Sequence, residues 1–525
     1  MNFRKRCWQR RWVRGLAWTA VTLVTLYALL CAWVNWSGAR QWSATQAMLK
    51  AEGETLDFRA TLNDPVPEAE NFCAIPLLKD LALAVDDDPN KGAHAEQRKR
   101  LEALMPPSGS KGAVRPRLAN VAFGKRTDLK AWADWMRKDG SLPMPADSGD
   151  AARDVLAALA NHDAVVQELA AGLHRPKAQW TPEWKTRELP EMLFAIKLPH
   201  YSPIQGLSRT LALRTSAAAR AGDAAKAHES ALIIARLSQA SLNDPFLIGL
   251  LVAASGANML CGVTWELCDA HAGTVEDFTR LEAALTGLDF HRGTLRALRS
   301  EMAAGVNALQ LMKRKRENSL ELLELVNGGS NPVGFIPRDW FARAIPSGFF
   351  DASAAASADL EFKYLLKPLR DHGWKEARQG TRDFETELTG MKQRIWTNPS
   401  CILASVIAPA MSSIINQVIY TQTLINEAII ACALERHRIA NGSYPDSLDA
   451  VRLADGKPLP PDPMDGKPMR YRKTTDGRYA LWSVGFDGKD DGGKRVIDEK
   501  KGESTRLSDE KYVGDWVWDF PGGLE

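Results

Sequence analysis

The chain has 525 residues, of which 45% are apolar and 25% charged, a composition typical of folded globular domains and unlike that of disordered, collagen-like or disulfide-rich chains. It carries 67 basic and 64 acidic side chains, for a net charge of +3. Six of the basic side chains lie in residues 1–14, which contain no acid, so the other 511 residues carry a net charge of −3 and have no general attraction for nucleic acid.

The basic tail is followed by an uncharged and mostly apolar stretch of 24 residues, 15–38. A helix rises about 1.5 Å per residue, so about 20 apolar residues span the hydrocarbon core of a bilayer. Tryptophans lie near both ends of the stretch, where a membrane helix has its aromatic belt: Trp12, Trp18, Trp33 and Trp36. Because basic flanks stay in the cytoplasm, we predict a single-pass signal anchor in the cell (inner) membrane, with a periplasmic ectodomain.

Two alternatives to a single anchor remain open. A cleaved signal peptide is one, although bulky Trp33 and Trp36 occupy the place where cleavage needs small residues. A second crossing is the other, since residues 245–265 and 399–426 are uncharged and long enough to span. Both stretches contain polar side chains (Ser, Asn, Gln and Thr), and placing these in a bilayer costs free energy. Buried helices of a large helical domain have the same composition.

Residues 39–398 show helical periodicity almost throughout. Residues 203–221 and 224–242 form a helical pair, in which Gly222 ends the first helix and Asp223 caps the second. Such pairs predict an array or bundle of α-hairpins, similar to a helical repeat but without the 34-residue period of tetratricopeptide repeats.

Other elements are predicted from the same periodicity. The pattern predicts one helix over residues 150–173 and further helices over residues 275–327. Pro245 is predicted to be the first residue of the helix that follows residues 224–242. The basic run 313–316 is interpreted as a solvated helix face balanced by nearby glutamates. The Gly-, Pro- and aromatic-rich residues 327–357 are predicted to be an irregular loop, either packed on the helices or a docking surface.

Motifs of known chemistry are missing from the sequence. It contains no Gly-x-Ser-x-Gly, His-Glu-x-x-His, Walker A, Gly-x-Gly-x-x-Gly or Cys-x-x-Cys pattern. The nine histidines have no metal-ligand spacing, and the seven cysteines show no regular framework. We therefore predict no catalytic residue and interpret the cysteines as small buried hydrophobic residues.

The last part of the chain has a different pattern. A long helix over residues 399–440 ends at Asn441-Gly442, and Asp-Gly pairs then recur every 10 or 11 residues, the rhythm of short antiparallel strands. The clearest predicted hairpin joins residues 469–474 to 478–484. Its inward side chains are predicted to include Tyr471, Tyr479 and Leu481.

Three segments of this region follow one another as ALERHRIANGSYPDSLDAV (433–451), PPDPMDGKPMRYR (460–472) and GRYALWSVGFDGKDDGG (477–493). In order and identity they resemble the globular head of the major pseudopilin of type II secretion systems. The resemblance covers roughly the last 100 residues and implies a small α+β head with antiparallel strands. His437 and Met464 depart from it, standing where that family usually has Tyr and Trp.

The resemblance does not extend to the rest of the chain. Pseudopilins join the membrane helix directly to the head helix, whereas residues 39–398 intervene here. Their leader is followed by a glutamate at the fifth position, and Ala20 stands at that position after Gly15. Polymerisation into a pseudopilus is therefore not expected.

The resemblance also implies a calcium site, because the acidic, glycine-rich loop of that family binds calcium. Calcium prefers six to eight oxygen ligands on a flexible loop. Four carboxylates of the loop are the candidate ligands: Asp487, Asp490, Asp491 and Asp498. A solvated polar turn remains the alternative, since cations such as Lys489 lie among these carboxylates.

The sequence thus predicts a mainly α-helical, membrane-anchored protein. Its segments are a cytoplasmic basic tail (1–14), a transmembrane anchor (15–38), a repeat-like α-helical ectodomain (39–398), a long helix (399–440) and a β-rich head (441–525). The predicted function is that of an envelope scaffold or interaction protein with a protein partner and no nucleic acid. A component of a type II secretion or pilus-like machine, and an uncharacterised envelope hydrolase, remain open as alternatives.

Overall fold

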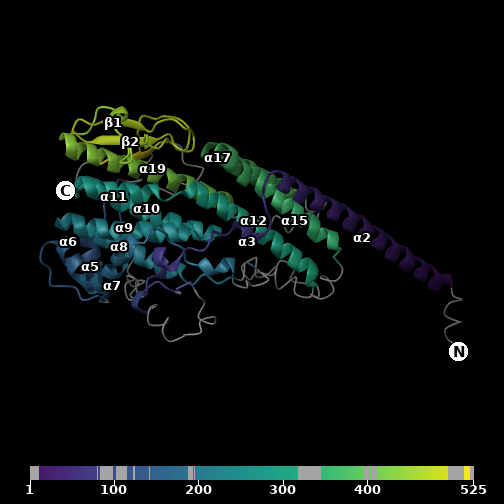
Figure 1. Cartoon of the computed structure of the whole chain (residues 1–525). Helices are drawn as coiled ribbons and strands as arrows, with labels where there is room; N and C mark the ends of the chain where they lie inside the picture. Colours follow the sequence, from purple (N-terminus) through teal and green to yellow (C-terminus); the bar gives the residue numbers. More distant parts are fainter. Residues whose placement is uncertain are drawn as a thin grey trace.

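The described residues form an elongated helical body that carries a small β-sheet at one end, while a long N-terminal helix projects from the other end (Figure 1). The computed structural model describes residues 11–79, 81–82, 99–101, 115–121, 124–140, 142–186, 193, 196–316, 345–394, 401, 403, 411–494 and 514–520. The predicted mainly helical fold with a small antiparallel sheet near the C-terminus is confirmed.

The elements have the following bounds. The α-helices are α2 (Arg11–Ala51), α3 (Phe58–Thr61), α5 (Leu129–Asp139), α6 (Ala151–Leu159), α7 (Asp163–Ala171), α8 (Tyr201–Ala221), α9 (Ala224–Leu242), α10 (Leu247–Asp269), α11 (Val275–Thr286), α12 (Phe290–Arg314), α15 (Ser347–Glu361), α16 (Lys367–His372), α17 (Trp374–Gln393) and α19 (Met411–Asn441). The strands are β1 (Arg470–Lys473), β2 (Tyr479–Ser483) and β3 (Trp516–Trp518).

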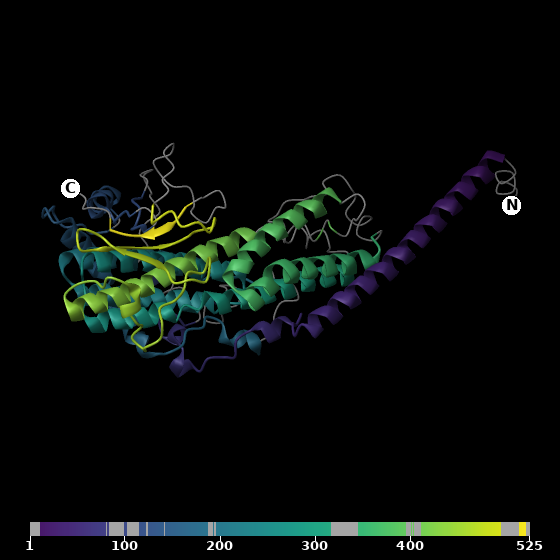
Figure 2. The same cartoon turned by 90° about the horizontal axis from the view of Figure 1, so that it is seen from above.

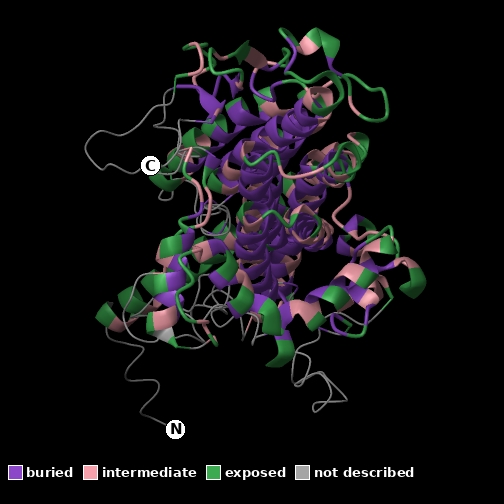
Figure 3. Ribbon diagram, turned by 90° about the vertical axis from the view of Figure 1, so that its left-hand side faces the viewer, coloured by how far each residue is buried: buried purple, intermediate pink, exposed green. Residues whose placement is uncertain are grey.

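Helix α10 lies at the centre of the body, packed against α8, α9, α12 and α19. Among the described residues, two helices are long and apolar enough to cross a membrane, α10 and α2. In α10, 72% of the most apolar window is buried inside the protein, whereas in α2 the buried share of that window is 0%. The apolar residues 245–265 therefore have the surroundings of a core helix. Figure 3 shows that buried helices fill the centre of the body. Helix α19, which covers residues 411–426 of the second uncharged stretch, is buried in the same core.

The predicted helical pair is confirmed as α8 and α9. Gly222 ends α8 with a φ of 83°, and the Asp223 carboxylate accepts a hydrogen bond of 3.0 Å from the Lys226 amide. The prediction for Pro245 is wrong, because α10 begins at Leu247. The amide of Leu247 donates instead to the Glu301 carboxylate of α12 at 2.9 Å, a cap from a distant part of the chain.

Two further predictions need correction. Residues 150–173 are not one helix: α6 and α7 are separated by a 3-10 turn, Ala160–His162. Residues 347–357 belong to α15 and not to a loop, while residues 317–344 lie outside the described residues. Pro346 immediately precedes α15 and Gly348 lies in its first turn, so residues typical of loops mark the start of a helix.

The predicted hairpin is confirmed as β1 and β2, which pair antiparallel with Tyr471 opposite Leu481. Strand β3, which the sequence did not predict, pairs with the other edge of β2. The sheet packs on the helical body, where the indole of Trp265 on α10 donates to the Asp519 carbonyl at 2.8 Å. One hydrophobic core therefore includes residues of both the helices and the sheet.

The described cysteines form no disulfide. Five of them are buried, in agreement with the prediction of small hydrophobic residues: Cys73, Cys261, Cys268, Cys401 and Cys432.

Helix α2 consists of a free part and a packed part. Its first half projects from the body with apolar side chains exposed, and its second half lies along α15 (Figure 2). The two backbones touch where the helices cross, since a Cβ on Gly38 would lie 2.0 Å from the Gly348 carbonyl oxygen. The Gly348 amide also donates to the Asn35 side chain at 2.8 Å. Short residues thus allow the close crossing.

The end of α2 is fixed to the body by ion pairs. Glu52 lies 2.8 Å from both Lys367 and Arg370. The buried Glu54 carboxylate lies 2.7 Å from Arg299 and 2.9 Å from Arg370. Because these pairs join the end of α2 to α12 and α16, α2 and the body form one connected unit.

Two buried carboxyl groups predict a pH-dependent stability. Burial raises the pKa of Glu361 to about 8 and that of Glu301 to about 7. In the folded chain each group keeps its proton up to its raised pKa, whereas in the unfolded chain it ionises above about pH 4.5, so the free energy of unfolding falls as pH rises from about 4.5 to 8. We expect Glu361→Gln to stabilise the chain by about 1–3 kcal/mol at pH 8.5 and much less at pH 5.

Thermal unfolding in detergent at these two pH values measures this difference. Glu276→Gln is the matched control, because Glu276 is exposed on α11. Equal shifts for the two variants at pH 8.5 would contradict the raised pKa of Glu361.

Candidate functional site

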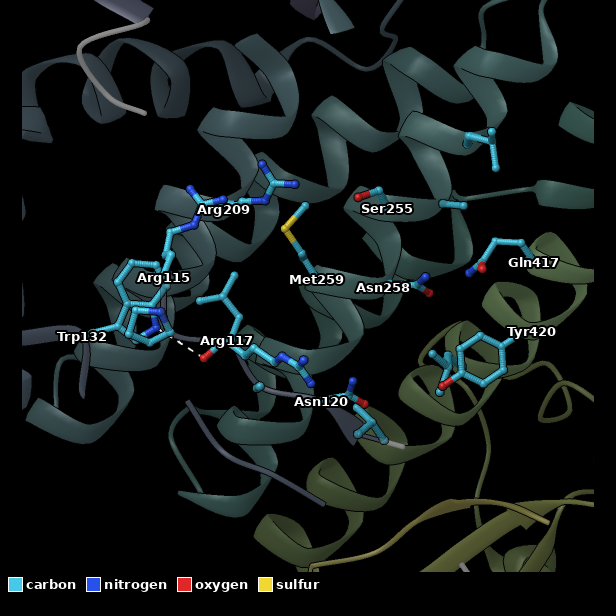
Figure 4. Close-up of a pocket in the computed structure, with 17 residues that line it drawn as sticks. Arg115, Arg117, Asn120, Trp132, Arg209, Ser255, Asn258, Met259, Gln417 and Tyr420 are labelled. Carbon is cyan, nitrogen blue, oxygen red and sulfur yellow. Dashed lines mark hydrogen bonds between the residues drawn. The ribbon is translucent and has the colours of Figure 1, made fainter. Parts of the chain in front are cut away.

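A cavity of about 650 Å³ opens between helices α8, α10 and α19 and the segment 115–121 (Figure 4). Helix α10 contributes Ser255, Asn258 and Met259, which lie on one half-buried stripe of an otherwise buried helix. Helix α19 contributes Gln417 and Tyr420, three residues apart and hence on one face. Two helical faces therefore form walls of the cavity.

The segment 115–121 is held in place through its backbone. The indole of Trp132 on α5 donates to the Arg117 carbonyl at 3.3 Å (Figure 4). The Ala119 amide donates to the Thr127 hydroxyl at 3.0 Å. Fixed carbonyl and amide groups leave the Arg115 and Arg117 side chains to line the cavity.

Three arginines line the cavity: Arg115, Arg117 and Arg209. Burial and the nearby charge of Arg209 both lower the pKa of Arg115 from its usual value. The described residues that line the cavity include no Asp or Glu. Two like charges thus share a partly desolvated site, with no carboxylate beside them among the described lining residues.

Neutral polar and aromatic groups complete the lining. The Asn258 side-chain oxygen is buried and has no hydrogen-bond partner among the described residues. The ring of Tyr420 packs edge-on against Trp516 of β3 with centroids 5.1 Å apart, so the sheet supports one wall. Trp132 and Tyr420 provide apolar surface beside the arginines.

The lining favours binding of an anion over proton transfer. It contains no carboxylate, histidine or cysteine among the described residues, the groups that most often act as general acids or bases. Among the described lining residues there are neither converging carboxylates nor a Ser–His pair. Planar guanidinium groups bind carboxylates and phosphates through paired, charge-assisted hydrogen bonds.

The predicted calcium ligands take part in the turns of their own loop. Asp487 accepts a hydrogen bond from the Lys489 amide at 3.1 Å, and Asp490 accepts one from the Trp482 indole at 2.9 Å. The Asp491 amide donates to Asp515 at 3.1 Å. Asp498 lies outside the described residues.

Asp515, which the sequence did not point to, joins this loop from the start of β3. Burial raises its pKa, and the nearby charges of Asp490 and Asp491 raise it further. Even so, no group of three or more His, Cys, Asp or Glu side chains within the described residues is placed to hold a metal ion. The described carboxylates do not form a coordination sphere, and calcium stays a prediction for this loop.

A second buried polar cluster surrounds His200. Its Nε2 lies 3.0 Å from the Asp244 carboxylate, and both side chains are at most 1% exposed. Trp180 and Tyr201 pack against the imidazole ring, with centroids 5.3 and 4.3 Å away. Because the His200–Asp244 pair is buried on all sides, we interpret it as a contact that stabilises the packing of the start of α8 against the loop before α10.

Sequence reasoning missed the residues of the cavity because they come from distant parts of the chain. One signal was present: Ser255 and Asn258 interrupt an apolar run at helical spacing. That pattern argued against a membrane span, but it also marked the half-buried stripe of α10. Nothing local distinguishes Arg115 or Arg209 from other arginines.

No known protein family, curated protein or solved structure matches this chain. The pseudopilin-like identity of the head therefore stays a prediction.

Proposed function

We propose that this chain is a membrane-anchored interaction protein of the cell envelope, and that it binds an anionic group of its partner or ligand in the cavity between α8, α10 and α19. The observation that carries the proposal is the pairing of Arg115 with Arg209 in a cavity whose lining contains no acid. Like charges close together in a partly buried site repel, and a bound carboxylate or phosphate removes that repulsion.

The expected affinity follows from the contacts available. A hydrogen bond to a charged group contributes about 1.5–3 kcal/mol, so two arginines supply about 3–6 kcal/mol. That corresponds to dissociation constants from above a millimolar to tens of micromolar. If the ligand has carbon atoms, apolar contact with Trp132 and Tyr420 adds to the favourable free energy of binding.

The membrane part of the proposal is supported by α2. Its apolar half is exposed to the surroundings, unlike the apolar helix α10, and it follows a tail with six basic residues. A bilayer covers such a surface, and the basic tail keeps the N-terminus in the cytoplasm. The cavity would then open outside the cytoplasm, where an envelope partner can reach it.

Citrate serves as the probe for the cavity, because its three carboxylates can bridge two guanidinium groups. We expect the full chain in detergent, in low-chloride buffer, to bind citrate measurably by calorimetry. We expect Arg209→Gln to weaken that binding at least tenfold, and Arg115→Gln to act in the same direction.

Arg153→Gln is the matched control, because Arg153 is exposed on α6 and is not in the cavity lining. Unchanged melting temperatures show that the variants fold. If citrate binds equally to the wild type, Arg209→Gln and Arg115→Gln, or binds to none of them, the cavity is not an anion site.

A further inference from the structure

Two adjoining cavities form a groove beside α9, and we name them together the α9 groove. The first, of about 420 Å³, lies between α9 and α11, and the second, of about 430 Å³, continues past the end of α9 to the start of α12. Pro176, Gln239 and Gly287 line both cavities, so the groove is continuous. It shares no lining residue with the cavity of Arg115 and Arg209.

One arginine is held in each cavity by neutral oxygens. Arg236 of α9 is half-buried, and its Nη1 donates to the Pro176 carbonyl at 2.9 Å and to the Gln239 side-chain oxygen at 2.7 Å. Arg296 of α12 is buried, and its Nη1 donates to the carbonyl and side-chain oxygens of Asn243 at 3.2 and 3.3 Å. In the described part of the chain these are the hydrogen bonds of the two guanidiniums, so their other nitrogens remain as donors for a ligand.

The surroundings disfavour the charge of both guanidiniums. Burial lowers the pKa of Arg236. Burial and the neighbouring charge of Arg292 lower the pKa of Arg296 to about 10, although Asp244 and Asp289 act in the opposite direction. A carboxylate bound in the groove would favour the charged form of both arginines.

The carboxylates that line the groove already have partners. Asp64 lies 2.6 Å from the Lys185 ammonium, and Asp289 accepts the Arg292 amide at 2.9 Å as the N-cap of α12. Two exposed arginines of the lining, Arg280 and Arg292, add positive charge at the rim. The groove is therefore suited to an anionic ligand.

The spacing of Arg236 and Arg296 selects the shape of that ligand. Gln239 and Asn243, which hold the two guanidiniums, are four residues apart at the end of α9, a helical rise of about 6 Å. In an extended peptide, side chains i and i+2 lie on the same side about 6.5 Å apart. Two acidic side chains separated by one residue therefore match the two arginines.

We infer that the α9 groove binds an extended acidic segment of a protein partner, with the carboxylates of residues i and i+2 on Arg236 and Arg296. A planar guanidinium binds a carboxylate through paired, charge-assisted hydrogen bonds. Because both arginines are already held in place, binding costs little side-chain entropy. Like the anion cavity, the groove would open outside the cytoplasm, so the partner is an envelope protein, a point that rests on α2 spanning the bilayer.

Fluorescence anisotropy with labelled peptides and the full chain in detergent tests the inference. The probe is acetyl-Thr-Glu-Val-Glu-Thr-amide, and we expect it to bind saturably. An isomer in the order Thr-Val-Glu-Glu-Thr has the same composition and charge, but its acidic side chains point to opposite sides when extended. We expect the isomer to bind at least fivefold more weakly, and a peptide with Gln in place of both Glu to show no saturable binding.

Substitutions in the chain locate the bound peptide. We expect Arg236→Gln to weaken binding of the probe at least fivefold. Arg296→Lys keeps a charge at the buried position but removes the planar fork, and we expect the same direction of change. Arg209→Gln in the other cavity and Arg153→Gln on the exposed face of α6 are the controls and should leave binding unchanged. Melting temperatures show that each variant folds, and Arg236→Gln decides alone if Arg296→Lys does not.

Four outcomes would overturn the inference. They are no saturable binding of the probe, equal binding of the probe and its isomer, unchanged binding in Arg236→Gln, and a loss of binding in Arg209→Gln that Arg236→Gln does not show. Displacement of the probe by an equal concentration of inorganic phosphate would identify a general anion site, and it would overturn the assignment to a peptide as well. Citrate binding that depends on Arg209 is measured separately, so the two sites can fail independently.

Discussion

Replacing Asp462 by alanine is expected to destabilise the chain by about 3–5 kcal/mol and to disorder the C-terminal sheet, since it leaves buried partners unpaired. The side chain is 0% exposed. Its carboxylate accepts hydrogen bonds from the amides of Met464 and Val484 at 2.9 and 3.0 Å and from the Ser483 hydroxyl at 2.8 Å. Arg470 of β1 lies 2.9 Å away. One carboxylate thus joins a turn, β1 and the end of β2.

Urea unfolding followed by near-ultraviolet circular dichroism measures this loss, because β2 and β3 contain Trp482, Trp516 and Trp518. Asp455→Ala is the control in the same region. Asp455 is half exposed and, among the described residues, its ion pair is with Lys457 of its own turn, so the loss of Asp455 should cost less than about 1 kcal/mol. Equal losses for Asp462→Ala and Asp455→Ala would refute the role given to Asp462.

Replacing Gly38 by leucine is expected to force α2 away from α15. A Cβ at this position would lie 2.0 Å from the Gly348 carbonyl oxygen, and one on Gly348 would lie 2.2 Å from the Val34 carbonyl oxygen. Both contacts are with backbone, so no side chain can rotate away to relieve them. Overpacking of this kind costs about 1–3 kcal/mol or more, and here it falls on the joint between anchor and body.

Pulsed electron resonance between spin labels at Ser43 and Asp359 reports the separation of the two helices. We expect Gly38→Leu to lengthen and broaden the distance distribution. Gly15→Leu is the control on the same helix, because nothing lies within 4 Å of a Cβ at Gly15. A distribution in Gly38→Leu that matches that of Gly15→Leu would show that the close crossing is absent.

Local patterns in the sequence predicted local structure correctly. Gly222 and Asp223 specify a helix end and a cap within a few residues, and Asp476-Gly477 specifies the turn between β1 and β2, where Gly477 has a φ of 80°. In each case the physical cause lies in neighbouring residues: left-handed backbone at glycine, and a carboxylate that reaches the next free amides. Helical periodicity likewise predicted that most of the body is α-helical.

The remaining features depend on contacts between distant residues. The cap of α10 comes from Glu301, 54 positions away, and β3 pairs with β2 although Trp516 and its partner Ser483 lie far apart in the sequence. The sequence predicts a loop where α15 lies because Pro346 and Gly348 break helices in most settings, whereas here Gly348 provides the close crossing with α2. The cavity combines residues 115–121 with α19, nearly 300 positions later. No local pattern carries such information.

The proposals share one central claim, that α2 crosses the bilayer once, with residues 1–14 in the cytoplasm and the body outside it. Labelling with a membrane-impermeant maleimide, in intact spheroplasts of a bacterial host, tests this claim most directly. Cys7 is a natural reporter for the tail, and Lys457→Cys adds one in an exposed turn of the head. The cysteines at 73, 261, 268, 401 and 432 are buried, and peptide mass spectrometry separates all sites.

We expect Lys457→Cys to react in intact spheroplasts and Cys7 to react only after the membrane is opened. Reaction of Cys7 in intact spheroplasts, or reaction of Lys457→Cys only after lysis, would contradict the claim.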